Sequence, residues 1–252
     1  MSALFDLTGR RAVVTGANRG IGFGMALALA EAGADIIGIS SQMPASGSDI
    51  EQAVLERGRQ YRGIACDLSD AEATADLAAE LRGAEVDILV NNAGAILRAP
   101  SAEHPMEWFE RIVRIDLTSQ FALAQAVGAS MLERGRGKII FTASLLSFQG
   151  GINVPGYAAA KSGIAGLVKA LSNEWSGQGL NVNAIAPGYI ATDNTQALRD
   201  DPDRSQAILD RIPANRWGTP ADIGGATVFL ASPASDYVNG IVLPVDGGWL
   251  GR

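Results

Sequence analysis

The chain has 252 residues, of which 47% are hydrophobic, so it can bury a large core as one α/β domain or as two smaller ones. Its formal charge of −7, without a basic cluster, argues against nucleic acid as the main partner. Cys66 is the only cysteine, no apolar run is long enough to span a membrane, and the first ten residues lack a signal-peptide pattern. These features predict a cytoplasmic protein that neither depends on disulfides nor enters a membrane.

The first half alternates short apolar strands with helices. Strands are predicted at residues 11–15, 35–39, 61–66 and 86–90, and helices at 21–32, 47–59 and 69–81. Gly33 is a candidate C-cap of the first helix. Ser69, followed three residues later by Glu72, forms a candidate capping box at the start of the third helix.

The second half continues in the same way. We predict helices at 105–133, 157–175 and 222–230, and strands at 138–142, 182–186 and 241–245. Strands separated by long helices form crossover units in a mostly parallel sheet, and continuous apolar strands are expected where helices cover both faces. The pattern therefore predicts one doubly wound α/β domain over residues 1–252, with a parallel sheet of about seven strands.

Residues 189–218 interrupt this alternation. The segment is polar, contains Asp200-Asp201-Pro202-Asp203, and follows the carboxyl end of the strand at 182–186. Ligands of doubly wound domains bind at that edge of the sheet, so the segment is predicted to be a mobile substrate lid. A surface excursion without a role is the alternative.

Glycines cluster between the first strand and the first helix, in Thr15-Gly16-Ala17-Asn18-Arg19-Gly20-Ile21-Gly22. Gly16 permits a sharp turn, Gly20 permits a close approach by a ligand, and Gly22 permits the helix to pack closely on the sheet. The free N–H groups and the positive dipole end of that helix suit a pyrophosphate. The loop is a candidate dinucleotide site, and a purely structural tight turn is the alternative.

Two polar turns follow later strands. Asp67 comes after the third strand, and Asn91-Asn92-Ala93-Gly94 comes after the fourth. Both turns are expected at the carboxyl edge of the sheet, near the glycine loop. An Asp at such a place is also a good turn former in its own right.

Tyr157 and Lys161 are four residues apart on a predicted helix and therefore share a face. A nearby ammonium favours the phenolate form of a tyrosine, which lets the tyrosine exchange a proton with a substrate. Ser144 ends the fifth strand and can donate a hydrogen bond to a substrate oxygen. A Tyr and a Lys four residues apart occur in many proteins, where the lysine is usually a surface residue without a catalytic role. It becomes specific only together with the preceding motifs.

These motifs, in this order, resemble the classical short-chain dehydrogenase/reductase family over essentially the whole chain. The resemblance implies a single-domain Rossmann fold, a homotetramer, and an NAD(P)-dependent oxidoreductase that acts on CH–OH groups. It assigns catalytic roles to Ser144, Tyr157 and Lys161. The cofactor site that it implies contains Tyr157 and Lys161 together with Gly16, Asn18, Arg19, Gly20, Ile21, Gly22, Ser40, Asp67, Leu68, Asn91, Ala93, Gly94, Pro187, Gly188, Ile190 and Thr192.

The chain departs from the family pattern at Asp116. The family usually has an asparagine there, which holds a water that relays protons from the lysine. An aspartate can hold that water as well, and a buried carboxylate near Lys161 would favour the charged ammonium. Asp116 is therefore included among the candidate catalytic residues.

The cofactor preference depends on the end of the second strand. NAD-preferring members usually carry an acid there, whereas this chain has Ser40-Ser41. Arg19 could meet a 2′-phosphate or could be a solvated loop cation. The residues alone leave NAD and NADP equally open.

Later segments look like the branch of 2-deoxygluconate 3-dehydrogenases, also called 2-keto-3-deoxygluconate oxidoreductases. These segments are 146–151, 185–189, 194–196, 210–214, 216–218 and 246–252. The resemblance implies a small-molecule sugar-acid substrate, a 2-keto-3-deoxy or 2-deoxy aldonic acid. It favours NAD as the cofactor, with NADP possible.

A sugar acid needs partners for its hydroxyls and a cation for its carboxylate. Gln149 and Asn153 can supply amides, and Arg98 is the first candidate cation, ahead of Arg216 and Arg252. Each arginine could equally be a surface salt-bridge partner. No metal site is expected.

Three alternatives remain at this point. One is a 2-keto-3-deoxy-fuconate or -rhamnonate 4-dehydrogenase. A 3-oxoacyl-carrier reductase is less expected, because its substrate favours a basic docking patch and NADPH. A nucleotide-binding regulator without catalysis is disfavoured by the intact Ser144, Tyr157 and Lys161. In a tetramer, the helices at 105–133 and from Tyr157 would form one interface and the C-terminal strand and tail another, so that Arg252 could reach a neighbouring site.

Overall fold

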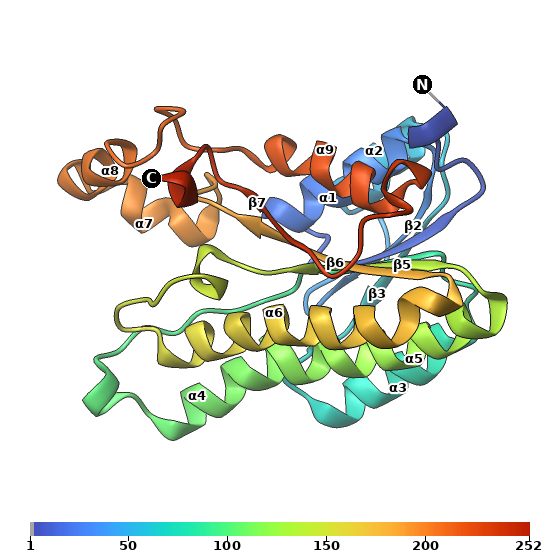
Figure 1. The fold of residues 1–252 in the computed structure, drawn as a ribbon, viewed down its shortest axis with the longest axis horizontal. Helices are drawn as coiled ribbons and strands as arrows, with labels where there is room; N and C mark the ends of the chain where they lie inside the picture. The colour runs from blue at the N-terminus through green and yellow to red at the C-terminus, as the bar shows by residue number, and fades with distance from the viewer. Residues whose placement is uncertain (1–2) are drawn as a thin grey trace.

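Seven parallel strands form one sheet at the centre of the computed structural model, which describes residues 3–252 (Figure 1). The order of the strands is β3-β2-β1-β4-β5-β6-β7, so the direction of winding reverses between β1 and β4. The predicted doubly wound sheet of about seven strands is confirmed. The strands are β1 (Arg11–Thr15), β2 (Asp35–Ser40), β3 (Tyr61–Ala65), β4 (Ile88–Asn91), β5 (Gly137–Thr142), β6 (Leu180–Pro187) and β7 (Val242–Val245).

Helices cover both faces of the sheet (Figure 1). One layer contains α3 (Ala71–Arg82), α4 (Met106–Val113), α5 (Ser119–Arg134) and α6 (Pro155–Trp175). The other layer contains α1 (Gly20–Glu31), α2 (Asp49–Glu56) and α9 (Pro220–Ala231). Among the described residues, no helix is both long and apolar enough to cross a membrane.

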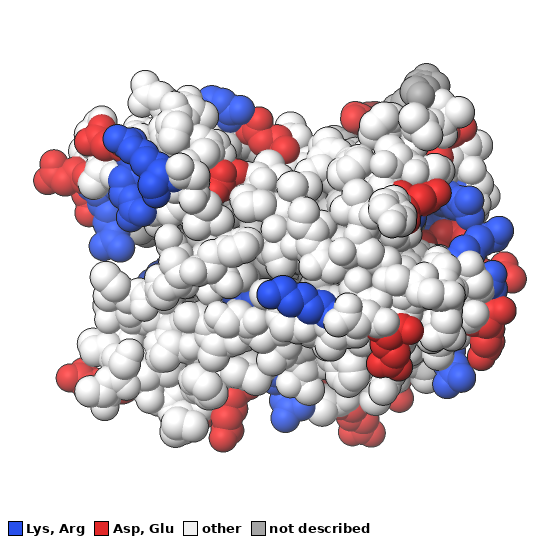
Figure 2. Space-filling view, viewed as in Figure 1, with Lys and Arg blue, Asp and Glu red and all other residues white. Residues whose placement is uncertain are grey.

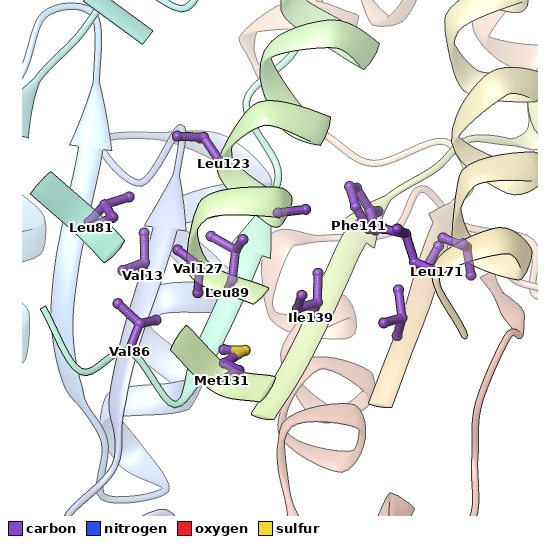
Figure 3. Close-up of a cluster of buried hydrophobic side chains, with 14 of the residues drawn as sticks. Val13, Leu81, Val86, Leu89, Leu123, Val127, Met131, Ile139, Phe141 and Leu171 are labelled. Carbon is purple, nitrogen blue, oxygen red and sulfur yellow. The ribbon is translucent and has the colours of Figure 1, made fainter. Parts of the chain in front are cut away.

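Side chains of the central strands pack alternately into the two layers. Val13 of β1 and Ile139 of β5 belong to the cluster under α5 and α6, where they lie with Val127 and Met131 of α5 (Figure 3). Val14, the neighbour of Val13, belongs to the cluster under α1 and α9. All five side chains are completely buried. Both faces of each central strand are therefore apolar, which is why these strands are continuous apolar runs in the sequence.

The start of α3 differs from the prediction. Asp70, rather than Ser69, is the N-cap residue, and its carboxylate accepts the backbone N–H groups of Glu72 and Ala73. Asp67 accepts the backbone N–H of Ser69 at 2.9 Å, which holds Ser69 in the preceding turn. Aspartate and serine are comparable caps, so the turn made by Asp67 decides where the helix begins. The predicted capping box of Ser69 and Glu72 is wrong.

The predicted long helix is present from Met106 to Arg134, but it is interrupted. A π-helical turn at Arg114–Thr118 separates α4 from α5. Such a turn inserts an extra residue into an α-helix and is often found at functional sites. Asp116 lies in this turn and is completely buried.

The predicted lid at 189–218 contains two short helices, α7 (Gln196–Arg199) and α8 (Pro202–Leu209). Its two ends are joined, because Ala191 donates to the carbonyl of Gly218 and Gly218 donates to the carbonyl of Tyr189. The segment lies at one end of the molecule beside the C-terminus (Figure 1). Acidic and basic side chains gather on its surface (Figure 2), in keeping with its polar sequence.

Candidate active site

A cavity of about 720 Å³ opens along the carboxyl ends of the strands, where the winding of the sheet reverses. Most of the residues predicted from the sequence line it, including the glycine loop and all of the candidate catalytic residues. These are Gly16, Asn18, Arg19, Gly20, Ile21, Gly22, Ser40, Asp67, Leu68, Ala93, Gly94, Arg98, Asp116, Ser144, Tyr157, Lys161, Pro187, Gly188, Ile190 and Thr192.

The glycine loop has the geometry of an anion site. Gly16 and Gly20 have positive φ angles of 70° and 58°, which favour glycine. A Cβ atom at Gly22 would lie 2.2 Å from the carbonyl oxygen of Gly16, so only glycine fits there. Helix α1 begins at Gly20, and its N-cap residue, Arg19, makes no side-chain capping bond. The first N–H groups of α1 are therefore left without a side-chain cap at the cavity wall, as a phosphate group requires.

The lid contacts this loop across the mouth of the cavity. Arg19 forms an ion pair with Asp193 of the lid, with 3.1 Å between Nη1 and Oδ2, although both side chains are largely exposed. A Cβ atom at Gly20 would lie 3.5 Å from Cγ2 of Thr192. The start of the lid, residues 192–195, is thus part of the cavity wall.

A hydrogen-bond network that the sequence did not reveal holds the turn after β4. The hydroxyl oxygen of Thr15 accepts the backbone N–H groups of Asn92 and Ala93, each at 2.9 Å. The hydroxyl of Thr142 donates to Oδ1 of Asn92 at 3.2 Å. Asn92 therefore joins the ends of β1, β4 and β5 at one point. In the sequence, the only indication of this network was that Asn92 is a second polar residue in the Asn-Asn-Ala-Gly turn.

Asn91 was predicted to line the cofactor site, but the structure places it in the core. It is completely buried, and its side-chain amide donates to the carbonyl of Gln120 at 3.1 Å. Gln120 in turn donates to the carbonyl of Ala93 at 2.8 Å. Asn91 thus supports the turn from below instead of facing the cavity.

Ser144 follows β5 at the cavity wall. Its Oγ accepts the backbone N–H of Leu146 at 3.2 Å, which fixes the oxygen and leaves the hydroxyl proton free to be donated. The hydroxyl of Ser147 donates to the backbone carbonyl of Lys161 at 2.7 Å. Ser147, which the sequence did not single out, therefore ties the segment after Ser144 to helix α6.

Lys161 is buried, and its side chain is 3% exposed. Its Nζ donates to the carbonyl of Thr142 at 2.9 Å and lies 3.2 Å from Oδ2 of Asp116. The same nitrogen lies 5.5 Å from the ring centroid of Tyr157. The sequence prediction that Tyr157 and Lys161 share a helix face is confirmed.

The buried pair has perturbed ionisation. Burial is the largest single influence on the pKa of Lys161 and lowers it, but the charges of Asp116 and Tyr157 and the contact with Asp116 together outweigh burial, so that the pKa is raised overall. Burial raises the pKa of Asp116, which Lys161 and the backbone N–H of Ala95 oppose. The N–H of Ala95 lies 2.8 Å from Oδ1 of Asp116.

The candidate substrate residues are only partly brought together. Arg98 lines the cavity and is exposed. Gln149 and Asn153 are not among the residues that line it, so their contact with the substrate stays a prediction. Asn153 has a positive φ of 63°, so the loop turns at this residue. The backbone carbonyl of Asn153 accepts a hydrogen bond from the N–H of Ala99.

Two other candidate arginines have partners elsewhere. Arg216 forms a double hydrogen bond with Asp222, at 2.8 and 2.7 Å, between the end of the lid and α9. Arg252 donates to the carbonyl of Asp210 at 2.7 Å within its own chain.

Several residues that line the cavity were not predicted from the sequence, and one of them is Arg111 on α4. Others are Ile39, Ser41, Gln42, Asn92 and Thr142. The pKa of Asp67 is lowered, mainly by the backbone hydrogen bond from Ser69 and to a smaller extent by the charge of Arg111. Within residues 3–252, no group of three or more His, Cys, Asp or Glu side chains is placed to hold a metal ion.

Comparison with known proteins agrees with this geometry. The family model described as Enoyl-(Acyl carrier protein) reductase matches residues 16–250. The chain is 59% identical to the 2-dehydro-3-deoxy-D-gluconate 5-dehydrogenase of Pseudoalteromonas atlantica, and the match covers 98% of each chain. It is 55% identical to the protein of the same name from Bacillus subtilis, over 98% of this chain and 97% of that one.

A solved structure is also similar. It comes from Agrobacterium tumefaciens, has NADP bound, and has 2-deoxy-D-gluconate 3-dehydrogenase as its candidate activity. The two chains share 49% identity, each is covered to 99%, and the TM-score is 0.93. The family and branch suggested by the sequence motifs are thereby confirmed.

The glycine loop generates a test. Gly22→Ala places a methyl group against the carbonyl of Gly16, so we expect it to cost about 2–3 kcal/mol of unfolding free energy and to weaken dinucleotide binding. Gly225→Ala is the matched control, because that helical glycine on α9 is exposed and has open space around its Cβ position. It should stabilise the protein by about 0.5–1 kcal/mol. Denaturant unfolding and calorimetric titration with NAD and NADP measure both effects, and equal behaviour of the two variants would contradict the assignment.

Proposed function

This chain belongs to the short-chain dehydrogenase/reductase family, and we propose that its substrate is a 2-keto-3-deoxy sugar acid that it oxidises or forms at C5. It is an NAD(P)-dependent oxidoreductase acting on CH–OH groups. One observation carries the proposal: Ser144, Tyr157 and Lys161 line the same cavity as the glycine loop and Arg98. The choice of C5 is supported by the two relatives at 59% and 55% identity, which are named 5-dehydrogenases.

The cavity fits a nicotinamide dinucleotide. The uncapped start of α1 and the glycine cradle suit the pyrophosphate, and Ser40 and Ser41 stand at the end of β2 where an acid would repel a 2′-phosphate. We propose that both NAD and NADP are accepted, because the serines at the end of β2 do not exclude the 2′-phosphate. When bound, the nicotinamide accepts or supplies the hydride.

The residues of the chain supply positioning and proton transfer. Ser144 donates a hydrogen bond to the reacting oxygen of the substrate, since its Oγ is already fixed by Leu146. Tyr157 removes the hydroxyl proton during oxidation and returns a proton to the carbonyl oxygen during reduction. Lys161 holds a positive charge beside Tyr157, which favours the phenolate that forms during reduction.

Tyr157→Phe tests these roles. The variant keeps the ring and loses the hydroxyl that exchanges the proton, so we expect kcat for oxidation of 2-keto-3-deoxygluconate to fall by about 100-fold or more. The affinity for NAD, measured by calorimetry, should change little. Tyr61→Phe is the matched control, because Tyr61 lies in β3, away from the catalytic group. Retention of activity in Tyr157→Phe would contradict the mechanism, whereas cofactor binding without turnover of any sugar acid by the unmodified protein would favour a regulator.

Arg98 is proposed as the cation that meets the substrate carboxylate. It lines the cavity, whereas Arg216 and Arg252 are engaged with the lid and its surroundings. Arg98→Gln should raise KM for the sugar acid about tenfold or more, because it removes a charge-assisted hydrogen bond. It should leave KM for a matched sugar without a carboxylate almost unchanged. An equal effect on both substrates would show that Arg98 does not recognise the carboxylate.

We also propose that the protein is a cytoplasmic homotetramer and that residues 189–218 act as its substrate lid. The lone cysteine, Cys66, is a free thiol, in keeping with a reducing compartment. Exposed apolar side chains on two separate surfaces support an assembly with two interfaces: Met106 and Phe121 on α4 and α5, and Tyr237 and Ile241 beside β7. The contact of residues 192–195 with the cavity supports the lid.

Sedimentation measures the assembly. Phe121→Arg should convert tetramers to dimers, because it places a charge in one apolar interface. The other interface, beside β7, is unchanged and should still hold two subunits together. Leu55→Arg is the matched control on α2, where an apolar side chain is similarly exposed but lies outside both surfaces. A monomeric unmodified protein, or no change in Phe121→Arg, would contradict the proposed interface.

A further inference from the structure

The wall of the cavity contains a buried carboxylate in direct contact with the lysine that stands beside Tyr157. The side chains of Asp116 and Lys161 are 0% and 3% exposed, and their charged atoms lie 3.2 Å apart. The other oxygen of Asp116 accepts the backbone N–H of Ala95 at 2.8 Å. An ionised carboxylate only accepts hydrogen bonds, so a backbone donor on one oxygen and an ammonium 3.2 Å from the other both stabilise the charged form.

We propose that Asp116 is a positioning residue that neutralises the charge of Lys161 and thereby raises the pH at which Tyr157 gives up its proton. This inference rests on the proposed role of Tyr157 in proton transfer. It differs from a water-holding role, because it assigns a function to the negative charge itself. An amide at this position could hold the same water but could not balance the ammonium.

The direction follows from the charge of the cluster. With Asp116 ionised, the group of Asp116, Lys161 and Tyr157 has no net charge before it loses its first proton. With a neutral side chain at position 116, the same group has a net charge of +1. A buried cationic cluster loses its first proton at lower pH than a neutral one. The carbonyl of Thr142 still accepts a hydrogen bond from Lys161 when position 116 is neutral and so holds the ammonium, which assigns the first proton to Tyr157. The carboxylate therefore delays ionisation of Tyr157.

The other charged groups near the cluster are poorly placed to replace this effect. The ionisable side chains on α4 and on the rest of the π turn are exposed, and they are Glu107, Glu110, Arg111 and Arg114. The segment at 145–147 and strand β6 contain no ionisable residue. Along the remaining cavity wall, the charged residues are also exposed: Arg19, Asp67, Arg98 and Asp193. Charges in contact with water are screened, so Asp116 dominates the field at Lys161.

A consequence concerns the two directions of the reaction. Reduction requires Tyr157 as the protonated phenol, and oxidation requires it as the phenolate. Asp116 extends the pH range over which the phenol is present. The protein should therefore reduce its ketone substrate well at neutral pH, while oxidation should become fast only at more alkaline pH.

Asp116→Asn tests the proposal, because it removes the charge and keeps an oxygen for the N–H of Ala95. Tyrosinate absorbance is titrated in the protein without cofactor, and subtraction of the matching Tyr157→Phe and Asp116→Asn/Tyr157→Phe titrations isolates Tyr157. The ionisation midpoint of Tyr157 should fall by about one pH unit in Asp116→Asn. In steady-state kinetics, the acidic limb of oxidation and the alkaline limb of reduction should both move to lower pH by the same amount.

Asp236→Asn is the matched control. Asp236 also pairs with a lysine, Lys138, at 2.7 Å, but this pair lies at the opposite edge of the sheet. The midpoint and both kinetic limbs should remain unchanged in that variant. Asp116→Glu keeps the charge and should stay closer to the unmodified protein than Asp116→Asn does.

An unchanged or higher midpoint of Tyr157 in folded Asp116→Asn would overturn the proposal. If circular dichroism shows that Asp116→Asn does not fold, Asp116→Ser provides the same comparison with a smaller neutral side chain. The titration without cofactor separates this inference from the proposed function. A shifted midpoint in a protein that turns over no sugar acid would refute the substrate assignment and leave the charge balance intact.

Discussion

The site depends on keeping a lysine ammonium charged in a place where water barely reaches it. An uncompensated buried charge costs several kcal/mol, so the Lys161 ammonium needs fixed polar partners. The carbonyl of Thr142 and the carboxylate of Asp116 provide them from β5 and from the π turn. Gly94 completes the arrangement, since a Cβ atom there would lie 2.8 Å from Oδ2 of Asp116. The small residue in the turn after β4 is therefore needed for the ion pair as well as for the cavity.

The second constraint is that three strand ends must meet at one point. Thr15, Asn92 and Thr142 are joined by hydrogen bonds across the carboxyl edges of β1, β4 and β5. The glycine loop follows the first of these strands, and the serine of the catalytic group follows the last. The parallel sheet thus brings together segments that are more than a hundred residues apart in the sequence, in line with the rule that such folds bind ligands where their winding reverses.

Much of the fold could be predicted because both faces of the sheet are covered. Short apolar strands and longer helices then alternate visibly, and the order of the glycine loop, Asn-Asn-Ala-Gly turn, Ser144 and Tyr157–Lys161 indicated the family. The π turn was missed because it inserts only one residue between two helical segments of ordinary composition.

Finer errors arose where neighbours had the same chemistry. Asn91 and Asn92 are both amides in one turn, yet Asn91 points into the core and Asn92 lies at the cavity. Ser69 and Asp70 are both good helix caps, and the turn at Asp67 favours the second. In each case the role depends on where the side chain lies in three dimensions, which the residue type alone does not specify.

Measuring the charge state of Lys161 tests the buried ion pair most directly. The chain has only three lysines, Lys138, Lys161 and Lys169, so their side-chain signals can be assigned in nuclear magnetic resonance spectra by single substitutions. A titration of the Lys161 side chain should show an ammonium at neutral pH that persists above the ordinary lysine range, because the pair with Asp116 raises its pKa. A neutral amine at neutral pH would contradict both the ion pair and the role it gives to Tyr157.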